Sequence, residues 1–310
     1  MSHVHLVIDI DHTLACAFES TKALKSALVV NPHLHYFLEN NLIIDALMPH
    51  LLHPGVIEFI QYIFKIPHIS LSFFSSAFEE RNVIFVRELL IRSLGVDYYN
   101  KVKDSVSVFS YKHLVLSSRC ITKDQFSFFK LLKKMPIVSQ YAIKQERYVE
   151  EEKKNLLVTL KKNETLENTL LIEDNPNYIY KGQEKNALIT SGVYLEYCMM
   201  QNDREIRQAN HIFYIVGLLK KIREPSDFSF IDKLFHLQFK INNQNFYEER
   251  YDELYQMRPY YLDGLAELQK INPQLEFFGG KKAIKYFFEE EAIKQLSEFN
   301  LPSWFAHHGL

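Results

Sequence analysis

Short apolar runs that alternate with helix-like segments are the feature that most constrains the fold of this chain. The helix-like segments, 55–64 and 81–94, place apolar residues at steps of three and four. Strand-length apolar runs lie around them, at residues 4–10, 69–74, 106–109, 170–172 and, more weakly, 187–189. Strands that alternate with helices favour a parallel sheet covered on both faces. The sequence therefore predicts an α/β fold built on a doubly wound parallel sheet.

Two aspartates end the first apolar run. Asp9 and Asp11 lie two residues apart, which puts both carboxylates on one face of the strand end, and Thr13 follows them. In such a pair one carboxylate can attack phosphorus and the other can handle the leaving-group proton, while a divalent cation shields the charge. The pattern indicates phosphoryl transfer, although Asp and Thr are also common at strand ends and in turns.

Polar residues also end two further predicted strands. Ser75 and Ser76 follow the second run, where a hydroxyl and the first amides of the next helix could bind phosphate oxygens. Alternatively, Ser75 could cap that helix. The run 170–172 leads to Asp174 and Asn175, whose oxygens could hold a hard cation or form an ordinary acidic turn. Because ligands bind at the carboxyl ends of parallel strands, we expect these residues to share one site.

The segment 150–157 contains three glutamates and two lysines, and we predict that it is helical. A single lysine from it could reach the same site, neutralise phosphate and hold the nucleophilic Asp ionised. Lysines in such a run could instead pair with the preceding glutamates. Lys154 is the preferred candidate, and Lys153 remains the alternative.

Taken in order, the four blocks resemble the haloacid dehalogenase (HAD) superfamily, whose motifs are Asp-x-Asp-x-Thr, a strand-ending Ser or Thr, a Lys and an acidic loop. Within it, the chain most resembles the small carboxy-terminal-domain (FCP/SCP-like) phosphatase branch, through His53-Pro54-Gly55 and Asp174-Asn175-Pro176. That branch has Arg in place of His53 and one more residue before the last proline. The resemblance covers about residues 1–220. The chain is also similar to HAD-type tyrosine phosphatases that Legionella delivers into host cells.

The resemblance implies a HAD-like Rossmannoid fold with a small cap, and a role for each matched residue. Asp9 would be the nucleophile that forms an aspartyl-phosphate, and Asp11 would be the general acid and then the base for water. Thr13 would orient Asp11, Ser75 would bind the phosphoryl oxygens with Ser76 beside it, and Lys154 would bridge phosphate and Asp9.

The resemblance also implies Mg²⁺ as the cofactor. The Asp9 carboxylate, the Asp11 backbone carbonyl and either Asp174 or Asn175 would hold the ion. His12 and Glu173 flank these positions, and we expect them to support the site from outside or to face solvent.

The substrate prediction depends on how much of the chain covers the site. The segment before residue 75 leaves little room for a large cap. Within the insert at about 110–148, the extra segment around 117–148 predicts only a small helical lid. An incompletely covered site favours a phosphorylated protein, with phosphotyrosine slightly ahead of phosphoserine. The alternatives are a phosphatase for a small metabolite or lipid headgroup, and a catalytically idle HAD scaffold whose C-terminal part binds a membrane or a partner.

The chain changes character at about residue 223, where the alternation gives way to helical patterns rich in aromatic residues. We therefore predict a phosphatase domain at 1–222 and a helical C-terminal domain at 223–310. Most of its aromatic side chains should form its core. Alternatively, Phe277 and Phe278 with the following lysines, or Trp304 with its neighbours, would form an exposed edge that contacts a membrane or protein partner.

Charge, cysteine content and hydrophobicity limit which classes of partner and which cellular compartment we predict. A formal net charge of −2 and a pI of about 6.7 give no chain-wide basic field for nucleic acid. Three widely spaced cysteines are typical of a reducing compartment and do not have the spacing of a thiolate metal site. We find no secretory signal and no apolar run long enough for a membrane span. The sequence predicts a soluble cytoplasmic protein or, for an effector, one located in the host cytoplasm or at the periphery of a host membrane.

Overall fold

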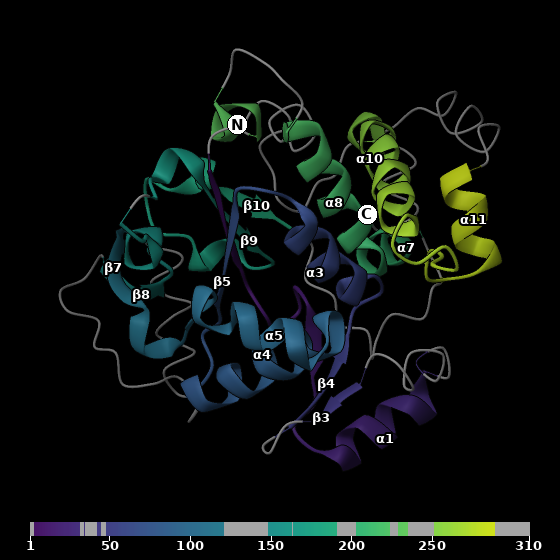
Figure 1. Ribbon diagram of the computed structural model, residues 1–310, viewed down its shortest axis with the longest axis horizontal. Helices are drawn as coiled ribbons and strands as arrows, with labels where there is room; N and C mark the ends of the chain where they lie inside the picture. Colours follow the sequence, from purple (N-terminus) through teal and green to yellow (C-terminus); the bar gives the residue numbers. More distant parts are fainter. Residues whose placement is uncertain are drawn as a thin grey trace.

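The computed structural model describes residues 3–31, 34, 42–44, 48–120, 148–162, 164–190, 203–223, 229–234 and 251–288. At its centre is a five-stranded sheet in the order β10-β9-β1-β5-β6, in which all neighbouring strands are parallel (Figure 1). The strands are β1 (Val4–Ile8), β5 (Ile69–Phe74), β6 (Ser107–Phe109), β9 (Thr169–Glu173) and β10 (Ala187–Ile189). This confirms the predicted α/β fold with a doubly wound parallel sheet.

The order of the strands places a switch point at the centre of the sheet. The chain begins in β1, adds β5 and β6 on one side, and then returns to add β9 and β10 on the other. Ligands of open parallel sheets bind at the carboxyl ends of the strands where the winding reverses. The carboxyl end of β1, where Asp9 and Asp11 follow the strand, is that position.

The two faces of the sheet are covered differently. Leu6 and Ile8 of β1 face a large hydrophobic cluster that includes residues of α3 (Val56–Lys65), α4 (Glu79–Leu94) and α8 (His211–Arg223). Val7 points to the opposite face, as strand alternation requires, and belongs to a smaller cluster. That face is covered by short 3₁₀ turns, η4 (Leu156–Thr159) and η5 (Leu166–Asn168), because the connection from β6 to β9 contains no described α-helix.

The segment between β1 and β5 contains more strands than the sequence predicted. This segment contains a three-stranded antiparallel sheet in the order β2-β4-β3. Its strands are β2 (Ala15–Ala17), β3 (Leu42–Ile44) and β4 (Pro49–Leu52). One helix, α1 (Thr21–Val30), lies between β2 and β3 in the chain. These strands have three or four residues each, which is too short for a clear alternation pattern in the sequence.

The predicted helix at 150–157 is wrong. Its first part is strand β8 (Tyr148–Lys153), which pairs antiparallel with β7 (Val115–Cys120), and η4 follows. Glu and Lys favour helices locally, but pairing with a distant strand overrides that preference. The same finding corrects the start of the predicted helical lid at about 110–148, where β7 is a strand. Residues 121–147 lie outside the described part of the chain.

The helices near the C-terminus pack onto the α/β part. In Figure 1, α8 lies beside α10 (Tyr251–Gln269), and α7 (Asp203–Ala209) and α11 (Lys281–Phe288) lie next to them. Residues before and after the predicted boundary at 222/223 belong to the same hydrophobic cluster. Asn272, just after α10, also donates a hydrogen bond to Glu58 of α3 over 2.8 Å. The helical segment therefore shares its core with the sheet.

The remaining short elements connect these parts of the chain. They are α5 (Val96–Val102), η2 (Lys103–Ser105), η3 (Tyr111–His113), η6 (Pro176–Tyr178) and η7 (Glu184–Asn186).

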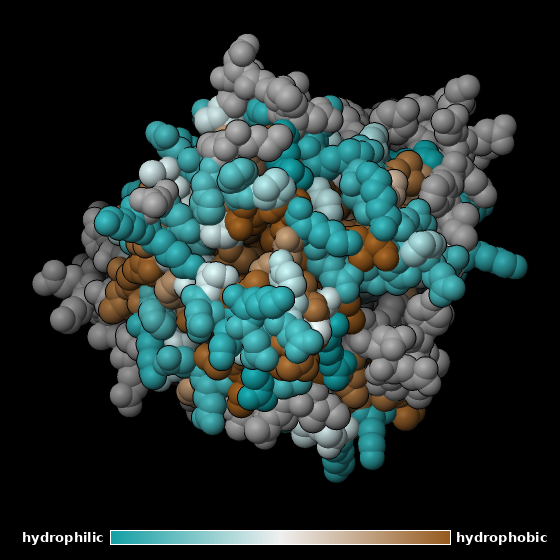
Figure 2. Space-filling view, in the orientation of Figure 1, coloured by the Kyte–Doolittle hydropathy of each residue, from teal (hydrophilic) through white to brown (hydrophobic). Residues whose placement is uncertain are grey.

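The expected membrane-contacting edge is only partly within the described residues. Phe277 and Phe278 are buried in the large hydrophobic cluster, so they do not form an exposed edge. Trp304 lies outside the described residues. Hydrophilic side chains cover most of the described surface on the face in Figure 2. Among the described helices, none has the length and apolar character needed to cross a membrane.

Candidate active site

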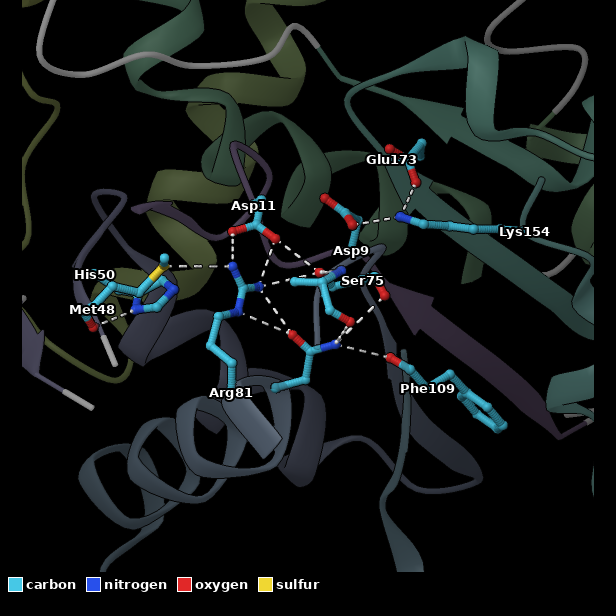
Figure 3. Close-up of polar contacts among 11 residues, drawn as sticks. Asp9, Asp11, Met48, His50, Ser75, Arg81, Phe109, Lys154 and Glu173 are labelled. Atoms are coloured by element: carbon cyan, nitrogen blue, oxygen red, sulfur yellow. Dashed lines mark hydrogen bonds and ion pairs between the residues drawn. The ribbon is translucent and has the colours of Figure 1, made fainter. Parts of the chain in front are cut away.

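Three strand ends bring together two predicted site residues, Asp9 and Ser75, and Glu173, which we expected to support the site from outside or to face solvent. Asp9 follows β1, Ser75 follows β5, and Glu173 is the last residue of β9. Because β1 lies between β9 and β5, Asp9 is the middle member of the row. Figure 3 shows the side chains of Asp9, Ser75 and Glu173 at this edge of the sheet.

Lys154 lies between two acidic side chains. Its Nζ is 2.5 Å from Oδ1 of Asp9 and 2.5 Å from Oε2 of Glu173 (Figure 3). The backbone N–H of Lys154 donates to the Tyr178 carbonyl over 2.7 Å, which fixes the residue where β8 ends. The Lys154 side chain is only 1% exposed. Burial alone would lower the pKa of this amine, but the carboxylates of Asp9 and Glu173 raise it above its ordinary value.

Lys153 points elsewhere. Its Nζ donates to the Asn177 carbonyl and lies 2.7 Å from Oε2 of Glu151. The structure therefore brings Lys154 to the acidic side chains and leaves Lys153 outside the site.

Asp9, Glu173 and Asp174 form a compact acidic cluster. One carboxylate oxygen from each lies within 4.8 Å of the others. Burial, followed by the charge of neighbouring carboxylates, raises the pKa of Asp9 to about 7. Burial is also the main cause that raises the pKa of Glu173 and of Asp174 to about 7. Lys154 supplies one positive charge to three carboxyl groups, so the ionised cluster carries excess negative charge.

This cluster fits a hard divalent cation. Carboxylate oxygens are the donors that Mg²⁺ prefers, and a cation would compensate the charge that Lys154 leaves unbalanced. Glu173 uses Oε2 to accept from Lys154 and Oε1 to accept from the backbone of Asn175 over 3.1 Å. Asp9 and Asp174 are thus the residues of the cluster best placed to hold the ion.

Two predicted residues make other contacts. The side-chain oxygen of Asn175 accepts from the backbone N–H of Asn177 over 3.0 Å, which caps η6. Ser76 is half-buried beside Ser75 and makes no hydrogen bond to the other predicted site residues that the structure describes.

Asp11 is bound by a residue that the sequence analysis missed. Arg81, in the first turn of α4, donates from Nη1 to Oδ1 of Asp11 over 2.8 Å and from Nη2 to Oδ2 over 2.6 Å. Ser75 donates its hydroxyl to Oδ2 of Asp11 over 2.8 Å (Figure 3). Burial would raise the pKa of Asp11, but the hydrogen bonds and charge of Arg81 hold it below its ordinary value.

A sequence signal for Arg81 exists. Arg81, Phe85 and Leu89 are spaced four residues apart and lie on the buried face of α4. An arginine at a core-facing position needs a buried partner, so its place in this pattern indicates a nearby acidic group. Glu173 carries a comparable signal because it continues the fully buried strand β9.

The Thr13 hydroxyl makes no hydrogen bond to Asp11. Its hydroxyl is buried and has no hydrogen-bond partner among the described residues. Its backbone carbonyl lies 2.7 Å from Nε2 of His211 and 3.2 Å from Nδ1 of His53. Helix α8, through His211, therefore contacts the loop that carries the two aspartates.

Comparisons with known proteins find little sequence similarity. No protein-family model matches the chain, and no curated protein matches it. Solved structures give a distant likeness. One is a variant of fission yeast RNA polymerase II CTD phosphatase Fcp1 bound to beryllium fluoride, with a TM-score of 0.35 and 10% identity, covering 89% of this chain and 68% of that one.

A second similar structure is Fcp1, described as an essential RNA polymerase II CTD phosphatase. Its TM-score is 0.35 and its identity 10%, over 96% of this chain and 67% of that one. Scores this low establish neither activity nor substrate, so the function must be argued from the geometry of the site.

Proposed function

We propose that this protein is a Mg²⁺-dependent phosphatase that acts through an aspartyl-phosphate on Asp9, and that its substrate is a phosphorylated protein. The observation that carries the proposal is the cluster of Asp9, Lys154, Glu173 and Asp174 beside Asp11 and Ser75. The site combines Asp9 as a buried carboxylate nucleophile, the ammonium group of Lys154 and the second carboxylate of Asp11. They lie where the winding of the sheet reverses.

Asp9 is suited to the nucleophilic step. Lys154 contacts only Oδ1 of Asp9 among the two carboxylate oxygens, so Oδ2 is available to attack phosphorus. The new bond joins Asp9 to phosphorus, and the bond from phosphorus to the leaving oxygen breaks. Lys154 favours the ionised form of Asp9 against the burial that disfavours it.

Asp11 takes the proton-transfer steps in this proposal, and its lowered pKa favours the ionised form that the base step needs. It would give a proton to the leaving oxygen and then take one from the water that attacks the aspartyl-phosphate, which releases inorganic phosphate and restores Asp9. Its side chain is 26% exposed, so water and substrate can reach it. When bound, Mg²⁺ would supply positive charge that offsets the charge on the phosphoryl oxygens.

An exposed aromatic pair supports a phosphotyrosine substrate. Phe78 is 68% exposed and Tyr111 is 42% exposed, and their rings meet edge to face at 5.5 Å between centroids. The pair adjoins Ser75, because Ala77 donates its N–H to the Ser75 hydroxyl and accepts from the N–H of Tyr111. Aromatic surface next to the site can pack against the ring of a phosphotyrosine side chain. Phosphoserine is the second candidate.

The first test is Mg²⁺-dependent release of phosphate from an aryl phosphate. Asp9→Asn should abolish release, and Asp11→Asn should reduce it strongly. Asp97→Asn is the matched control, because Asp97 is an exposed aspartate on α5. Mass spectrometry of acid-quenched protein should find the phosphoryl group on Asp9. Full activity in Asp9→Asn would rule out the aspartyl-phosphate mechanism.

A second test addresses the substrate. Phosphotyrosine and phosphoserine peptides of the same sequence would be compared on the wild type and on Tyr111→Ala. Tyr98→Ala is the control, because Tyr98 is also 42% exposed and also meets a phenylalanine edge to face. We expect Tyr111→Ala alone to lose activity selectively on phosphotyrosine. Equal losses on both peptides would argue against recognition of the ring by this pair.

A further inference from the structure

We infer that Arg81 is the positioning residue that fixes the Asp11 carboxylate against Ser75, a role that the Asp-x-Asp-x-Thr pattern gives to Thr13. The inference rests on the proposed phosphatase function and deepens it. It concerns a residue that contacts Asp11 and Ser75 but needs no contact with the substrate.

The contacts between Arg81 and Asp11 fix the orientation of the carboxylate. The guanidinium donates one hydrogen bond to each oxygen of Asp11, at 2.8 and 2.6 Å. Two parallel bonds of this kind prevent the carboxylate from rotating about its terminal bond. Nη2 of Arg81 also lies 3.2 Å from the Ser75 hydroxyl, which itself donates to Asp11. The three side chains therefore form a closed ring of hydrogen bonds.

Arg81 is itself held firmly in place. Its Nε and Nη2 donate to Oδ1 of Asn82 over 3.2 and 3.0 Å. The amide nitrogen of Asn82 in turn donates to the backbone carbonyls of Ala77 and Phe109, over 3.4 and 3.3 Å. Those carbonyls lie just beyond β5 and at the end of β6. Asp11 is thus connected to the backbone of β6 and of the segment that follows β5 (Figure 3).

The alternative, that Arg81 binds the phosphoryl group directly, does not fit these contacts. Nε donates to Asn82, Nη1 contacts Asp11 and the Met48 sulfur, and Nη2 contacts Asp11, Ser75 and Asn82. The Arg81 side chain is 6% exposed. A phosphoryl group could take a donor only by breaking one of these buried bonds.

Thr13 lacks the contacts that the same role requires. Its hydroxyl makes no hydrogen bond to any described residue, whereas its backbone carbonyl is bound by His211 and lies near His53. Thr13 therefore contributes to the shape of the loop through its backbone, and the side chain that orients Asp11 comes from α4.

The test compares Arg81→Lys, Arg81→Ala and Thr13→Val in the aryl-phosphate assay. Arg87→Lys is the matched control, because Arg87 lies on the same helix with its side chain 50% exposed. Lysine keeps the charge of Arg81 but cannot form the two-pronged contact. We expect kcat to fall by about 100-fold in Arg81→Lys with little change in KM, and much less in Thr13→Val. Added guanidinium ion should partly restore kcat in Arg81→Ala.

Other results would overturn the inference. A rise in KM at constant kcat in Arg81→Lys would show that Arg81 binds substrate, and a larger loss in Thr13→Val than in Arg81→Lys would return the role to Thr13. An inactive wild type would reject the proposed function and the positioning role together. An active wild type with an equally active Arg81→Lys would reject the positioning role alone.

A measurement without catalysis separates this role from misfolding. Urea unfolding of Arg81→Lys, Asp11→Asn and the double variant gives the coupling free energy between the two side chains. The same cycle with Thr13→Val should show no coupling to Asp11. Absence of coupling between Arg81 and Asp11 would contradict the contact on which the inference depends.

Discussion

The ammonium of Lys154 lies 2.5 Å from Oδ1 of Asp9, although 145 residues separate the two in the chain. Lys154 reaches this position from the end of a β-ribbon and also contacts Glu173. The contact joins the second half of the α/β part to the first strand. Lys154 therefore supplies one positive charge to a buried cluster of three carboxyl groups.

Removing this lysine should reduce both activity and stability. In Lys154→Met the buried carboxyl groups lose their cation, which should cost about 3 kcal/mol of unfolding free energy at pH 8. The loss should be smaller at pH 6, where protonation relieves the repulsion among carboxyl groups whose pKa is about 7. Urea unfolding at both pH values measures this. Lys153→Met is the adjacent control, and an equal effect there would contradict a special role for Lys154.

Metal binding should depend on Asp174 and on pH. The folded-state pKa values of Asp9, Glu173 and Asp174 are raised to about 7. The protonated groups therefore stabilise the folded state fully when the pH is below about 4, which is their pKa in the unfolded chain. This stabilisation is lost as the pH rises through 7. Mg²⁺ replaces the missing positive charge, so its stabilising effect should be larger at pH 8 than at pH 6.

Thermal unfolding with and without Mg²⁺ tests this prediction. Asp174→Asn should lose most of the Mg²⁺-induced rise in Tm, whereas Asn175→Ala should retain it, because the side-chain oxygen of Asn175 is already used to cap η6. The opposite pattern would transfer the metal-binding role to Asn175.

A histidine at the other end of the sheet should make the protein sensitive to acid. His5 is fully buried, with Nε2 2.8 Å from the Ser72 hydroxyl and Nδ1 3.1 Å from Glu164. Burial lowers the pKa of His5 from 6.5 to about 4, while Glu164 opposes the change and Lys161 adds to it. Its neutral form stabilises the fold above pH 6.5, and this contribution is lost as pH falls through about 4.

The variant His5→Gln should therefore lose stability less steeply than the wild type between pH 7 and pH 4. The difference between a pKa of 6.5 and one of about 4 corresponds to about 3 kcal/mol at most. His3→Gln, at a histidine whose side chain is 45% exposed, is the control and should follow the wild-type curve. Parallel curves for His5→Gln and the wild type would contradict the prediction.

Two glycines permit the close packing of α8 and α10. A Cβ added at Gly217 would overlap the Tyr260 carbonyl, and one added at Gly264 would overlap the Phe213 carbonyl. Alanine has the better helix propensity, but here the backbone clash should dominate and cost about 3 kcal/mol at either position. Urea unfolding measures the loss.

Gly95→Ala provides the comparison for these glycine variants. Gly95 has a φ of +78° and no atom within 4 Å of an added Cβ, so alanine should cost only about 1 kcal/mol of backbone strain there. Unfolding free energies of Gly217→Ala and Gly264→Ala no lower than that of Gly95→Ala would show that the two helices can separate without penalty.

The local sequence predicted the central elements well because their signals are short-range. All five predicted strands are present, and Asp9 and Ser75 lie at strand ends as the pattern indicates. Apolar runs of strand length followed by polar residues carry this information within a few positions. The same reasoning failed for residues 150–157, where helix-favouring Glu and Lys residues pair with a strand more than 30 residues away.

The sequence by itself determined the parallel α/β core and the pair of aspartates at the end of its first strand, because periodicity and residue order are local properties. Only the tertiary structure decided that Lys154 rather than Lys153 meets Asp9, that Arg81 holds Asp11, and that Thr13 is bound through its backbone. These choices depend on distances between residues brought together by strand pairing and helix packing. The partner of a buried charge depends on the distance between the two groups and on their burial in the folded protein. Residue type and sequence spacing specify neither.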